Sequence, residues 1–375
     1  MFHVDGERGF RGGERQLLYL AAALKARGHR NVIACRRGEA LEAEAARQGF
    51  ETLPLPFYCE LDPLTALPLR ARAAKSERPV LHAHTAHAAG VAMLASCFGG
   101  PARVSHRRVD FALGGGLSRR CKYGRAGGVV AVSRAIADVM SGPGLSRESI
   151  AVVPDGLPVD VEECGWAGVD AARFAPPSPE ERAEFRSRLA AEFNLGDDLF
   201  WIGNAAALVP HKDHDTLIAA ALIVLLKRPK TLFLIAGEGP EKERLFTSIK
   251  RTGLTGRVLL LGHRPDALPV LKACDAFCLS SWGEGMGSVL LEAAACGLPI
   301  AATTAGGIPE VVEDGRSALL CPPRSPEALA QNLLRLIDDA ALRRRLTDAA
   351  RADLPKFGLA RMAEQLEKVY EAALA

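Results

Sequence analysis

Two glutamates flank a glycine-rich stretch in the last third of the chain. The stretch, residues 280–292, reads Ser-Ser-Trp-Gly-Glu-Gly-Met-Gly-Ser-Val-Leu-Leu-Glu. The apolar residues 276–279 before it predict a buried strand, and residues 289–296 predict a helix that Gly297 and Pro299 end. This order is typical of an anion site, because glycines let the backbone approach a ligand and the first helical turn offers unpaired N–H groups to a phosphate.

Both carboxylates of this stretch can reach a ligand at the helix start. Glu284 lies on the loop, and Glu292 lies four residues beyond Ser288, on the same helical face and leaning toward the N-terminus. A carboxylate beside a phosphate is unfavourable unless it accepts hydrogen bonds, which sugar hydroxyls can donate. Taken alone, the pattern also fits a solvated loop charge and a partly exposed helix residue, because short glycine motifs match by chance.

Three histidines, His82, His84 and His87, lie at the end of the predicted strand over residues 79–87. Ligands bind at the carboxyl ends of strands in open α/β sheets, so these side chains are well placed for chemistry. The spacing also allows a metal, but no nearby Asp, Glu or Cys completes such a site. Ordinary polar residues at a strand end are the remaining interpretation.

The wider context of the two glutamates carries a family resemblance. Glu284 begins the run Glu-Gly-Met-Gly-Ser-Val-Leu-Leu-Glu-Ala-Ala-Ala-Cys-Gly-Leu-Pro-Ile, which is followed by Gly306-Gly307, Glu310 and Asp-Gly-Arg-Ser-Ala-Leu-Leu-Cys-Pro-Pro. Together they strongly resemble the donor-site segment of glycosyltransferase family 4. That family has the two-domain GT-B fold and transfers sugars from nucleotide donors with retention of anomeric configuration and without a metal.

The resemblance implies a role for each matching residue. Glu284 would contact donor sugar hydroxyls, Glu292 the ribose, and the backbone of residues 286–288 the pyrophosphate, while His84 in His-x-His would lie beside the reacting sugar. Lys212 falls in a stretch similar to the pyrophosphate-binding Gly-Arg-Leu-x-x-x-Lys. The predicted catalytic residues are His84, Lys212 and Glu284, and the predicted donor-binding residues are Gly12, Gly13, Lys212, Gly237, His263, Arg264, Glu284, Gly285, Met286, Gly287, Ser288 and Glu292.

One position departs from the family pattern. Ala207 stands five residues before Lys212, where the family usually carries an arginine. One of two cationic contacts to the pyrophosphate is therefore expected to be missing. Either Lys212 acts with only the helix start to help it, or another cation such as Arg264 or His211 compensates.

Apolar segments of strand and helix length alternate along the whole chain, which favours parallel sheets with crossover helices. The predicted fold is α/β of the GT-B type: two Rossmann-like domains whose parallel sheets face each other across a cleft, with a C-terminal helix that crosses back to the first domain. We expect an acceptor-binding domain over 1–157 with a returning helix over 358–375, a linker and entry helix over 158–198, and a nucleotide-sugar-binding domain over 199–357.

Charge separates the two halves. Up to Asp155 the chain has 22 Lys and Arg against 14 Asp and Glu, a net charge of +8, and the remainder has 25 against 30, a net charge of −5. Residues 111–128 hold six glycines and predict a mobile basic loop for acceptor binding, with Arg119, Arg120, Lys122 and Arg125. A solvated basic face explains the same charges equally well.

Composition limits the class of protein. With 48% hydrophobic and 24% charged residues, the chain is typical of a soluble globular protein, and no apolar run reaches the roughly 18–20 residues that span a membrane. The start lacks a signal-peptide core, so a cytoplasmic location is expected, with peripheral contact at the inner face of the cell membrane. The nine cysteines are scattered without a zinc-site spacing, and we expect buried free thiols.

The sequence therefore predicts a retaining glycosyltransferase in cell-surface polysaccharide or lipopolysaccharide synthesis. Its partners would be a UDP- or GDP-sugar donor, a glycan or lipid-linked acceptor and an anionic membrane surface, with no nucleic acid, no metal and no cofactor. Two alternatives remain at this stage. A GT-B nucleotide-sugar epimerase needs acid and base carboxylates on both sides of the sugar, which are not identifiable here, and a non-catalytic sugar-nucleotide-binding protein would keep only the donor segment.

Overall fold

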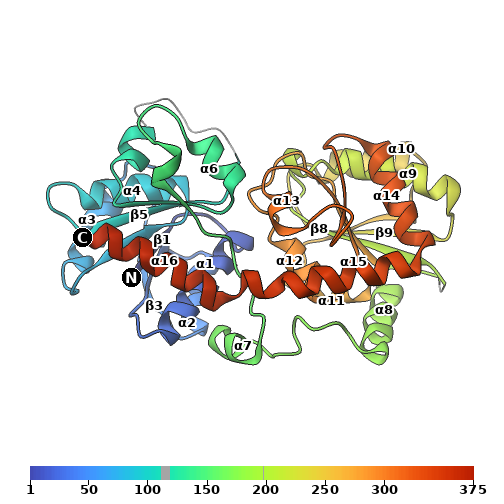
Figure 1. Ribbon diagram of the computed structural model, residues 1–375, viewed down its shortest axis with the longest axis horizontal. Helices are drawn as coiled ribbons and strands as arrows, with labels where there is room; N and C mark the ends of the chain where they lie inside the picture. Colours follow the sequence, from blue (N-terminus) through green and yellow to red (C-terminus); the bar gives the residue numbers. More distant parts are fainter. Residues whose placement is uncertain (111–118, 197) are drawn as a thin grey trace. The chain divides into compact units, whose positions relative to one another are not determined.

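The computed structural model describes residues 1–110, 119–196 and 198–375 (Figure 1). The chain divides into two compact units. The first holds Met1–Asp170 together with Lys356–Ala375, and the second holds Ala171–Pro355. Residues 158–170 of the expected linker thus belong to the first unit, and the rest of that segment belongs to the second.

The first unit is built on a parallel sheet of seven strands, in the order β3-β2-β1-β4-β5-β6-β7. Its described elements are β1 (Phe2–Asp5), α1 (Gly12–Ala26), β2 (Val32–Arg36), α2 (Ala40–Arg47), β3 (Glu51–Leu55), α3 (Pro63–Ala73), β4 (Val80–Ala83), α4 (Ala86–Ser96), β5 (Ala102–Arg107), the π-helical turn η1 (Arg120–Gly124), β6 (Gly128–Ala131), α6 (Arg134–Met140), the 3₁₀ turn η2 (Arg147–Ser149), β7 (Ile150–Val152), α7 (Val161–Ala167) and α16 (Leu359–Leu374).

Alternating side chains of the strands bury both faces of this sheet. On β2, Ile33 and Cys35 pack with α1 and α2, whereas Val32 and Ala34 belong to the core formed with α3 and α4. Because both faces are covered, most strand residues are apolar, as is typical of parallel sheets, although His3, His82 and His106 lie within strands. Further polar residues follow the carboxyl ends of the strands, where a site can form.

The second unit is built on a parallel sheet of six strands, in the order β10-β9-β8-β11-β12-β13. Its described elements are α8 (Pro179–Phe193), β8 (Phe200–Ala205), the 3₁₀ turn η3 (Pro210–Lys212), α9 (His214–Lys227), β9 (Thr231–Ala236), α10 (Lys242–Arg251), β10 (Val258–Gly262), α11 (Leu268–Ala273), β11 (Ala276–Leu279), α12 (Val289–Ala295), β12 (Ile300–Thr303), α13 (Ile308–Val311), β13 (Leu319–Cys321), α14 (Pro326–Asp338) and α15 (Ala340–Asp353). The 3₁₀ turn η4 (Leu354–Phe357) leads to α16.

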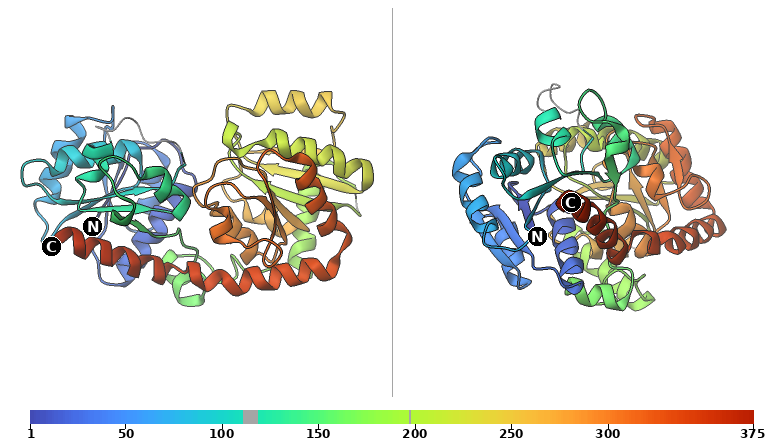
Figure 2. Two further views of the ribbon diagram at one scale, coloured as in Figure 1. Left: turned by 45° about the horizontal axis from the view of Figure 1, so that its top comes forward. Right: turned by 60° about the vertical axis from the view of Figure 1, so that its left-hand side comes forward.

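The C-terminal helix α16 packs on the first unit, and both ends of the chain lie there (Figure 2). The Tyr370 hydroxyl lies 2.8 Å from Nδ1 of His82 on β4, and Glu367 pairs with Arg27 at 2.6 Å. Gly128 is needed for this packing, because a Cβ there would lie 2.6 Å from a methyl group of Val369.

Several elements differ from those that the sequence predicts. Gly12 and Gly13, predicted as donor-binding residues, form the first turn of helix α1. His87 lies exposed in α4 and not at a strand end. Of the basic loop, residues 111–118 lie outside the described residues, and the expectation of a loop is wrong for Arg120–Gly124, which is helical.

The cysteines are free, as expected, but not all are buried. Cys59 is exposed, and Cys97 and Cys121 are half-buried. The thiols of the strand residue Cys278 and of Cys274 are fully enclosed, and burial raises the pKa of each well above its ordinary value. Within the described parts of the chain, no helix combines the length and the apolar character that a membrane crossing requires.

Candidate active site

The glycine-rich stretch leaves the carboxyl end of β11, a strand whose four residues are fully buried. Hydrogen bonds from its first residues connect it to the 3₁₀ turn η3, which follows β8. The Ser280 hydroxyl donates to the Lys212 carbonyl at 3.0 Å, and the Trp282 N–H donates to the His211 carbonyl at 2.9 Å. The loops after β8 and β11 are therefore fixed to each other.

Lys212 and Glu284 form the polar centre of this edge. The Lys212 ammonium lies 2.6 Å from Oε1 of Glu284, and the Ser281 hydroxyl donates to the same oxygen at 2.7 Å. The Glu284 side chain is 6% exposed and that of Lys212 is 20% exposed. A buried ion pair is costly to break unless each partner receives a replacement. A phosphate for Lys212 and sugar hydroxyls for Glu284 would be such replacements.

The backbone around Glu284 requires a glycine opposite it. Gly306, which follows β12, has φ +49°, and a Cβ on it would lie 1.8 Å from the Glu284 carbonyl oxygen. No other residue fits without moving the loop. The Gly306-Gly307 pair of the family segment therefore has a structural role beside the predicted donor site.

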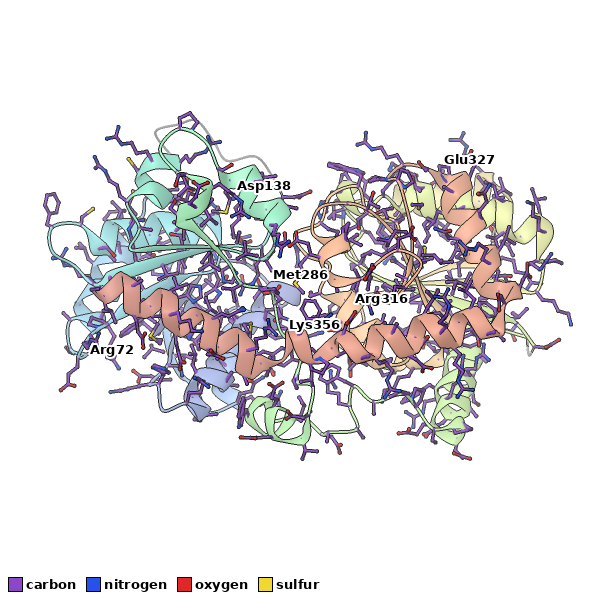
Figure 3. The ribbon with its side chains drawn as sticks, viewed as in Figure 1. Arg72, Asp138, Met286, Arg316, Glu327 and Lys356 are labelled. Carbon is purple, nitrogen blue, oxygen red and sulfur yellow. The ribbon has the colours of Figure 1, made fainter. Side chains whose placement is uncertain are left out.

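The remaining predicted donor residues of the glycine-rich stretch lie in the loop before α12 and in the first turn of that helix. Met286, labelled in Figure 3, is buried, Gly287 has φ +78°, and Ser288 directly precedes the helix. Glu292 is half-buried in the first turn of α12, as the spacing predicts.

The other predicted donor residues of the second unit lie on different strands. Gly237 follows β9, and a Cβ there would lie 1.9 Å from the Ala206 carbonyl, next to Ala207. His263 is exposed after β10. The Arg264 guanidinium lies 2.5 Å from Glu192 on α8 and 5.6 Å from the centre of the Phe193 ring. Arg264 would have to leave α8 to compensate for Ala207.

An open pocket lies beside the same loops but does not include Lys212 or Glu284. It is lined by residues such as Pro210, Asp213, Glu241 and Trp282. The Arg324 guanidinium also lines it and lies 4.9 Å from the centre of the Trp282 ring. Its lining carries carboxylates and arginines in mixture, which does not suit a pyrophosphate.

His84, the catalytic candidate of the first unit, lies just beyond β4 and is 5% exposed. Its Nε2 lies 3.1 Å from Nδ1 of His3 on β1, and its Nδ1 lies 2.8 Å from Nη1 of Arg108, which follows β5. Arg108 in turn donates to Asp155 at 2.7 Å. Burial, together with the charge of Arg108, holds the pKa of His84 well below its ordinary value, so the ring is neutral.

Two further histidine rings, those of His82 and His106, lie beside this one. The rings of His82 and His84 are 4.1 Å apart, and those of His82 and His106 are 5.4 Å apart and nearly parallel. Burial holds the pKa of His82 and His106 well below the ordinary value and lowers that of His3 to about 3. Neither ring nitrogen of His106 has a hydrogen-bond partner within the described structure.

His3, His82 and His84 lie close enough together to hold a metal ion, with one ring nitrogen of each within 4.8 Å of the others. Both nitrogens of His3 and of His84 already take part in hydrogen bonds, and a guanidinium is adjacent. A cation would have to break those bonds beside a fixed positive charge. The arrangement therefore favours the hydrogen-bonded cluster over a metal centre.

The last residue of β1, Asp5, also carries a buried carboxyl group. Asp5 is 2% exposed, and burial followed by the nearby charge of Glu14 raises its pKa to about 7. Glu14 itself accepts a hydrogen bond from the Arg11 N–H at 2.7 Å. The exposed glycines Gly12 and Gly13 lie between Arg11 and Glu14, in the first turn of α1.

The four basic residues predicted to bind an acceptor are divided. Lys122 forms an ion pair with Glu60 and is 13% exposed, and its carbonyl accepts from Arg103 at 2.7 Å. Arg119 is half-buried, whereas Arg120 and Arg125 are exposed. The latter two are the members of the group placed to meet an anion.

The sequence interpretation missed His3, Arg108, Asp155 and Ser281. The rule used for His84, that polar residues at the carboxyl ends of parallel strands meet at one edge, also applies to Arg108 after β5 and Asp155 after β7. Ser281 follows β11 directly, and its small hydroxyl gave no such signal.

Comparisons with known proteins agree with this architecture. Anabaena HepE, solved in complex with UDP and glucose, superposes with a TM-score of 0.84 at 22% identity over 99% of both chains. The D-inositol 3-phosphate glycosyltransferase of Corynebacterium jeikeium is 31% identical over 65% of this chain and 56% of its own length. A GDP-mannose-dependent monoacylated phosphatidylinositol monomannoside mannosyltransferase of Corynebacterium glutamicum is 34% identical over 50% of this chain and 49% of its own length. The chain thus spans about half the length of these curated relatives.

Two parallel sheets with this element order and these structural neighbours define the GT-B class of fold. Within that class, residues 10–161 match the model described as Glycosyltransferase Family 4, and residues 185–353 match the model described as Glycosyl transferases group 1. The chain belongs to glycosyltransferase family 4.

Proposed function

We propose that this protein is a retaining glycosyltransferase that moves a sugar from a nucleotide-sugar to a glycan or lipid-linked acceptor in cell-surface polysaccharide or lipopolysaccharide synthesis. The contact between Lys212 and Glu284 carries the proposal, because it brings together a cation suited to a pyrophosphate and a carboxylate suited to sugar hydroxyls. Family membership supports the same interpretation of these residues.

The donor would be a UDP- or GDP-sugar. HepE is solved with UDP and with UDP-glucose, and the mannosyltransferase of C. glutamicum is named as GDP-mannose-dependent. We assign Glu292 to the ribose and the N–H groups of residues 286–288 to the pyrophosphate, following the family segment. Gly12, Gly13, Gly237, His263 and Arg264 would complete the donor contacts.

In the proposed reaction, the bond between sugar C1 and the phosphate oxygen breaks while a bond from the acceptor oxygen to C1 forms on the same face. The acceptor proton passes to the departing phosphate oxygen. Lys212 stabilises the charge that develops on that leaving group, and no metal is required. Glu284 would leave Lys212 and orient the sugar through its hydroxyls.

An unusual surface supports a membrane-bound acceptor. The outward stripe of α3 is apolar, with Leu64 and Leu67 each more than 60% exposed, and Tyr58 and Leu61 continue it. Arg70 joins this stripe to the 99% exposed Phe98 by donating to the carbonyls of Cys97 and Phe98. We call Tyr58, Leu61, Leu64, Leu67 and Phe98 the α3 surface.

Basic residues border the α3 surface at the end of the helix. Lys75 and Arg78 are exposed, and Arg72, labelled in Figure 3, pairs with Glu51 and lies over the Phe2 ring. Apolar side chains with flanking cations suit an anionic bilayer, because the interface buries the apolar groups and the anionic lipids attract the cations. We therefore propose that the α3 surface holds the enzyme against the inner face of the cell membrane.

Donor binding is tested by a melting-temperature screen with UDP-, GDP- and ADP-sugars, because a ligand that binds only the folded state stabilises it. We expect one nucleotide class to raise the Tm, and expect sugar transfer from that donor with retained configuration, read by NMR of the product. A donor that is converted to its epimer in the absence of acceptor would point to an epimerase instead. No stabilisation by any nucleotide-sugar would contradict the proposal.

Membrane docking is tested by sedimentation with vesicles of phosphatidylcholine containing phosphatidylglycerol. Wild-type protein should co-sediment, less so as salt screens the charges over about 10 Å. Leu64→Glu with Leu67→Glu should remain in the supernatant, whereas Leu226→Glu, at a residue that is 79% exposed on the second unit, serves as the matched control. Equal sedimentation of both variants would refute the α3 surface as the docking site.

A further inference from the structure

His84 is one link in a chain of hydrogen bonds whose direction can be derived. Asn31 Nδ2 lies 3.2 Å from the Ala21 carbonyl and 3.0 Å from the His29 carbonyl, so the amide nitrogen is the donor and Oδ1 faces the other way. Oδ1 lies 3.0 Å from Nε2 of His3, which must therefore carry a proton. A neutral imidazole has one N–H, so Nδ1 of His3 is an acceptor and Nε2 of His84 donates to it.

The hydrogen bond at the other end of this series, between Arg108 and His84, leads to the same tautomer of His84. A guanidinium can only donate, so Nδ1 of His84 must accept from Nη1 of Arg108. Arg108 is itself fixed by Asp155, and the side chains of this pair are 9% and 7% exposed. Both ends thus require the same form of His84, which is neutral, with the proton on Nε2.

The other tautomer would create two mismatches. An N–H on Nδ1 would face the Arg108 N–H at 2.8 Å, and the reversed His3 would present a lone pair to Asn31 Oδ1 at 3.0 Å. A doubly protonated ring would also place an N–H against Arg108. Burial and the Arg108 charge act in the same sense, since both lower the pKa of His84.

We propose that Arg108 is a positioning residue for His84, and that Arg108, His3 and Asn31 together hold the His84 ring in the Nε2–H form with its Nδ1 lone pair directed at Arg108. This inference rests on the proposed function, in which His84 acts beside the reacting sugar. Both ring nitrogens of His84 are then engaged, Nδ1 by Arg108 and Nε2 by His3, so the ring is held in one orientation beside the sugar and exchanges no proton with an incoming hydroxyl.

The tautomer can be read without any substrate. Long-range ¹H–¹⁵N NMR spectra of protein labelled only at its nine histidines distinguish the two neutral forms. Signals lost in His84→Asn assign His84. We expect one form, protonated at Nε2, that does not titrate between pH 8 and 6. A proton on Nδ1, or a mixture of forms in the wild-type protein, would overturn the proposal.

The positioning role is tested by Arg108→Met combined with Asp155→Asn, which avoids leaving the Asp155 carboxylate buried and unpaired. We expect His84 to keep its proton on Nε2, because His3 still accepts there, but to lose the Arg108 contact that fixes its ring. We expect kcat to fall by about 100-fold, a usual consequence of misplacing a reacting group, with donor KM changed less than threefold. Arg108→Lys, which keeps a donor for Nδ1, should recover part of the loss. Unchanged kcat in the double variant would refute the role.

His106→Leu is the matched control, because His106 is buried beside the same cluster but lies outside the chain of hydrogen bonds. It should keep the His84 tautomer and kcat. If the wild-type protein transfers no sugar but shows the expected tautomer, the proposed function fails while the hydrogen-bond chain stands. If it transfers sugar but shows the other tautomer, the hydrogen-bond chain fails while the proposed function stands.

Discussion

The carboxyl edges of the two sheets differ in their charged groups and in how those groups are paired. At the edge of the second unit, Lys212 and Glu284 form a buried pair in which each partner can exchange the other for a ligand. At the edge of the first unit, neutral histidines and one guanidinium form a chain in which every bond of His84 and His3 is already made. The first arrangement suits binding of a charged group, and the second suits holding a ring in one orientation.

The largest expected effect comes from removing the cation of the exchangeable pair. Lys212→Ala should lower kcat by at least 100-fold, because a developing charge in a water-poor site loses a cationic partner worth about 3 kcal/mol or more. Lys230→Ala, in a fully exposed pair with Asp198, is the control. The measurement is steady-state transfer from the donor found by the melting screen.

Ala207 makes this prediction sharper. Because Arg264 is held by Glu192, we expect Lys212 to act without a second arginine. A loss at Arg264→Ala as large as at Lys212→Ala would mean that Arg264 leaves α8 for the ligand. Near-normal turnover of both variants would mean that the pyrophosphate does not lie at this loop.

Lowering the pH should destabilise the first unit more than the second. His3, His82, His84 and His106 have pKa values lowered by burial, so the unfolded state binds more protons than the folded state below about pH 6.5. Each group then removes about 1.4 kcal/mol of stability per pH unit as the pH falls toward its folded pKa. Among the described residues of the second unit, His214 alone has such a shift, to about 4.

The sign is opposite for Asp5, whose pKa is raised to about 7. Its folded form holds a proton that the unfolded form loses, so its contribution is complete below about pH 4 and is lost as the pH rises to about 7. Urea unfolding at pH 7 and 5.5, followed by pulse proteolysis with mass spectrometry, should show the first unit weakening more than the second. Asp5→Asn should steepen that loss, and earlier unfolding of the second unit would contradict this expectation.

The residues at the two sheet edges also show what could and could not be predicted from the sequence. The alternation of apolar segments predicted both parallel sheets, and the strand predicted over 276–279 and the helix predicted over 289–296 are β11 and α12, with β11 agreeing to the residue. Lys212 and Glu284 could be placed together because they follow adjacent parallel strands, β8 and β11. The series of hydrogen bonds from Asn31 to Asp155 could not be predicted, because it depends on the rotamers of side chains from five separate strands and loops.

The same limit explains the other differences. Periodicity says nothing about which partner a surface arginine selects, so the contact of Arg264 with α8 had no sequence signal. Lys122 was predicted to lie in a basic loop. It lies in the helical turn η1, where its ammonium pairs with Glu60 and its carbonyl accepts from Arg103. The outward apolar stripe of α3 was likewise hidden, because a helix that is apolar all round is normally buried.

A smaller effect should distinguish the two glutamates. Glu292→Ala should weaken binding of both free nucleotide and nucleotide-sugar, because both contain ribose. Glu284→Ala should spare the free nucleotide and lose roughly 1.5–3 kcal/mol of transition-state stabilisation through its charge-assisted hydrogen bonds to the sugar. Calorimetric titration with both ligands checks this, and equal losses of nucleotide affinity would refute the division.

The smallest expected effect is that of removing metal ions. Because Lys212 and backbone N–H groups are proposed to stabilise the leaving group, dialysis against EDTA should leave the transfer rate within about twofold, and added Mg²⁺ should not raise it. A rate that collapses in EDTA and returns with a divalent cation would assign the leaving-group charge to a metal.

A crystal structure of the complex with the donor selected by the melting screen tests the contrast between the two edges most directly. We expect the Lys212 ammonium to move from Glu284 to a phosphate oxygen and Glu284 to accept hydrogen bonds from the sugar. Arg108 should still contact Nδ1 of His84. A bound nucleotide-sugar with the contact between Lys212 and Glu284 intact, or one seated away from residues 283–288, would contradict the proposed exchange.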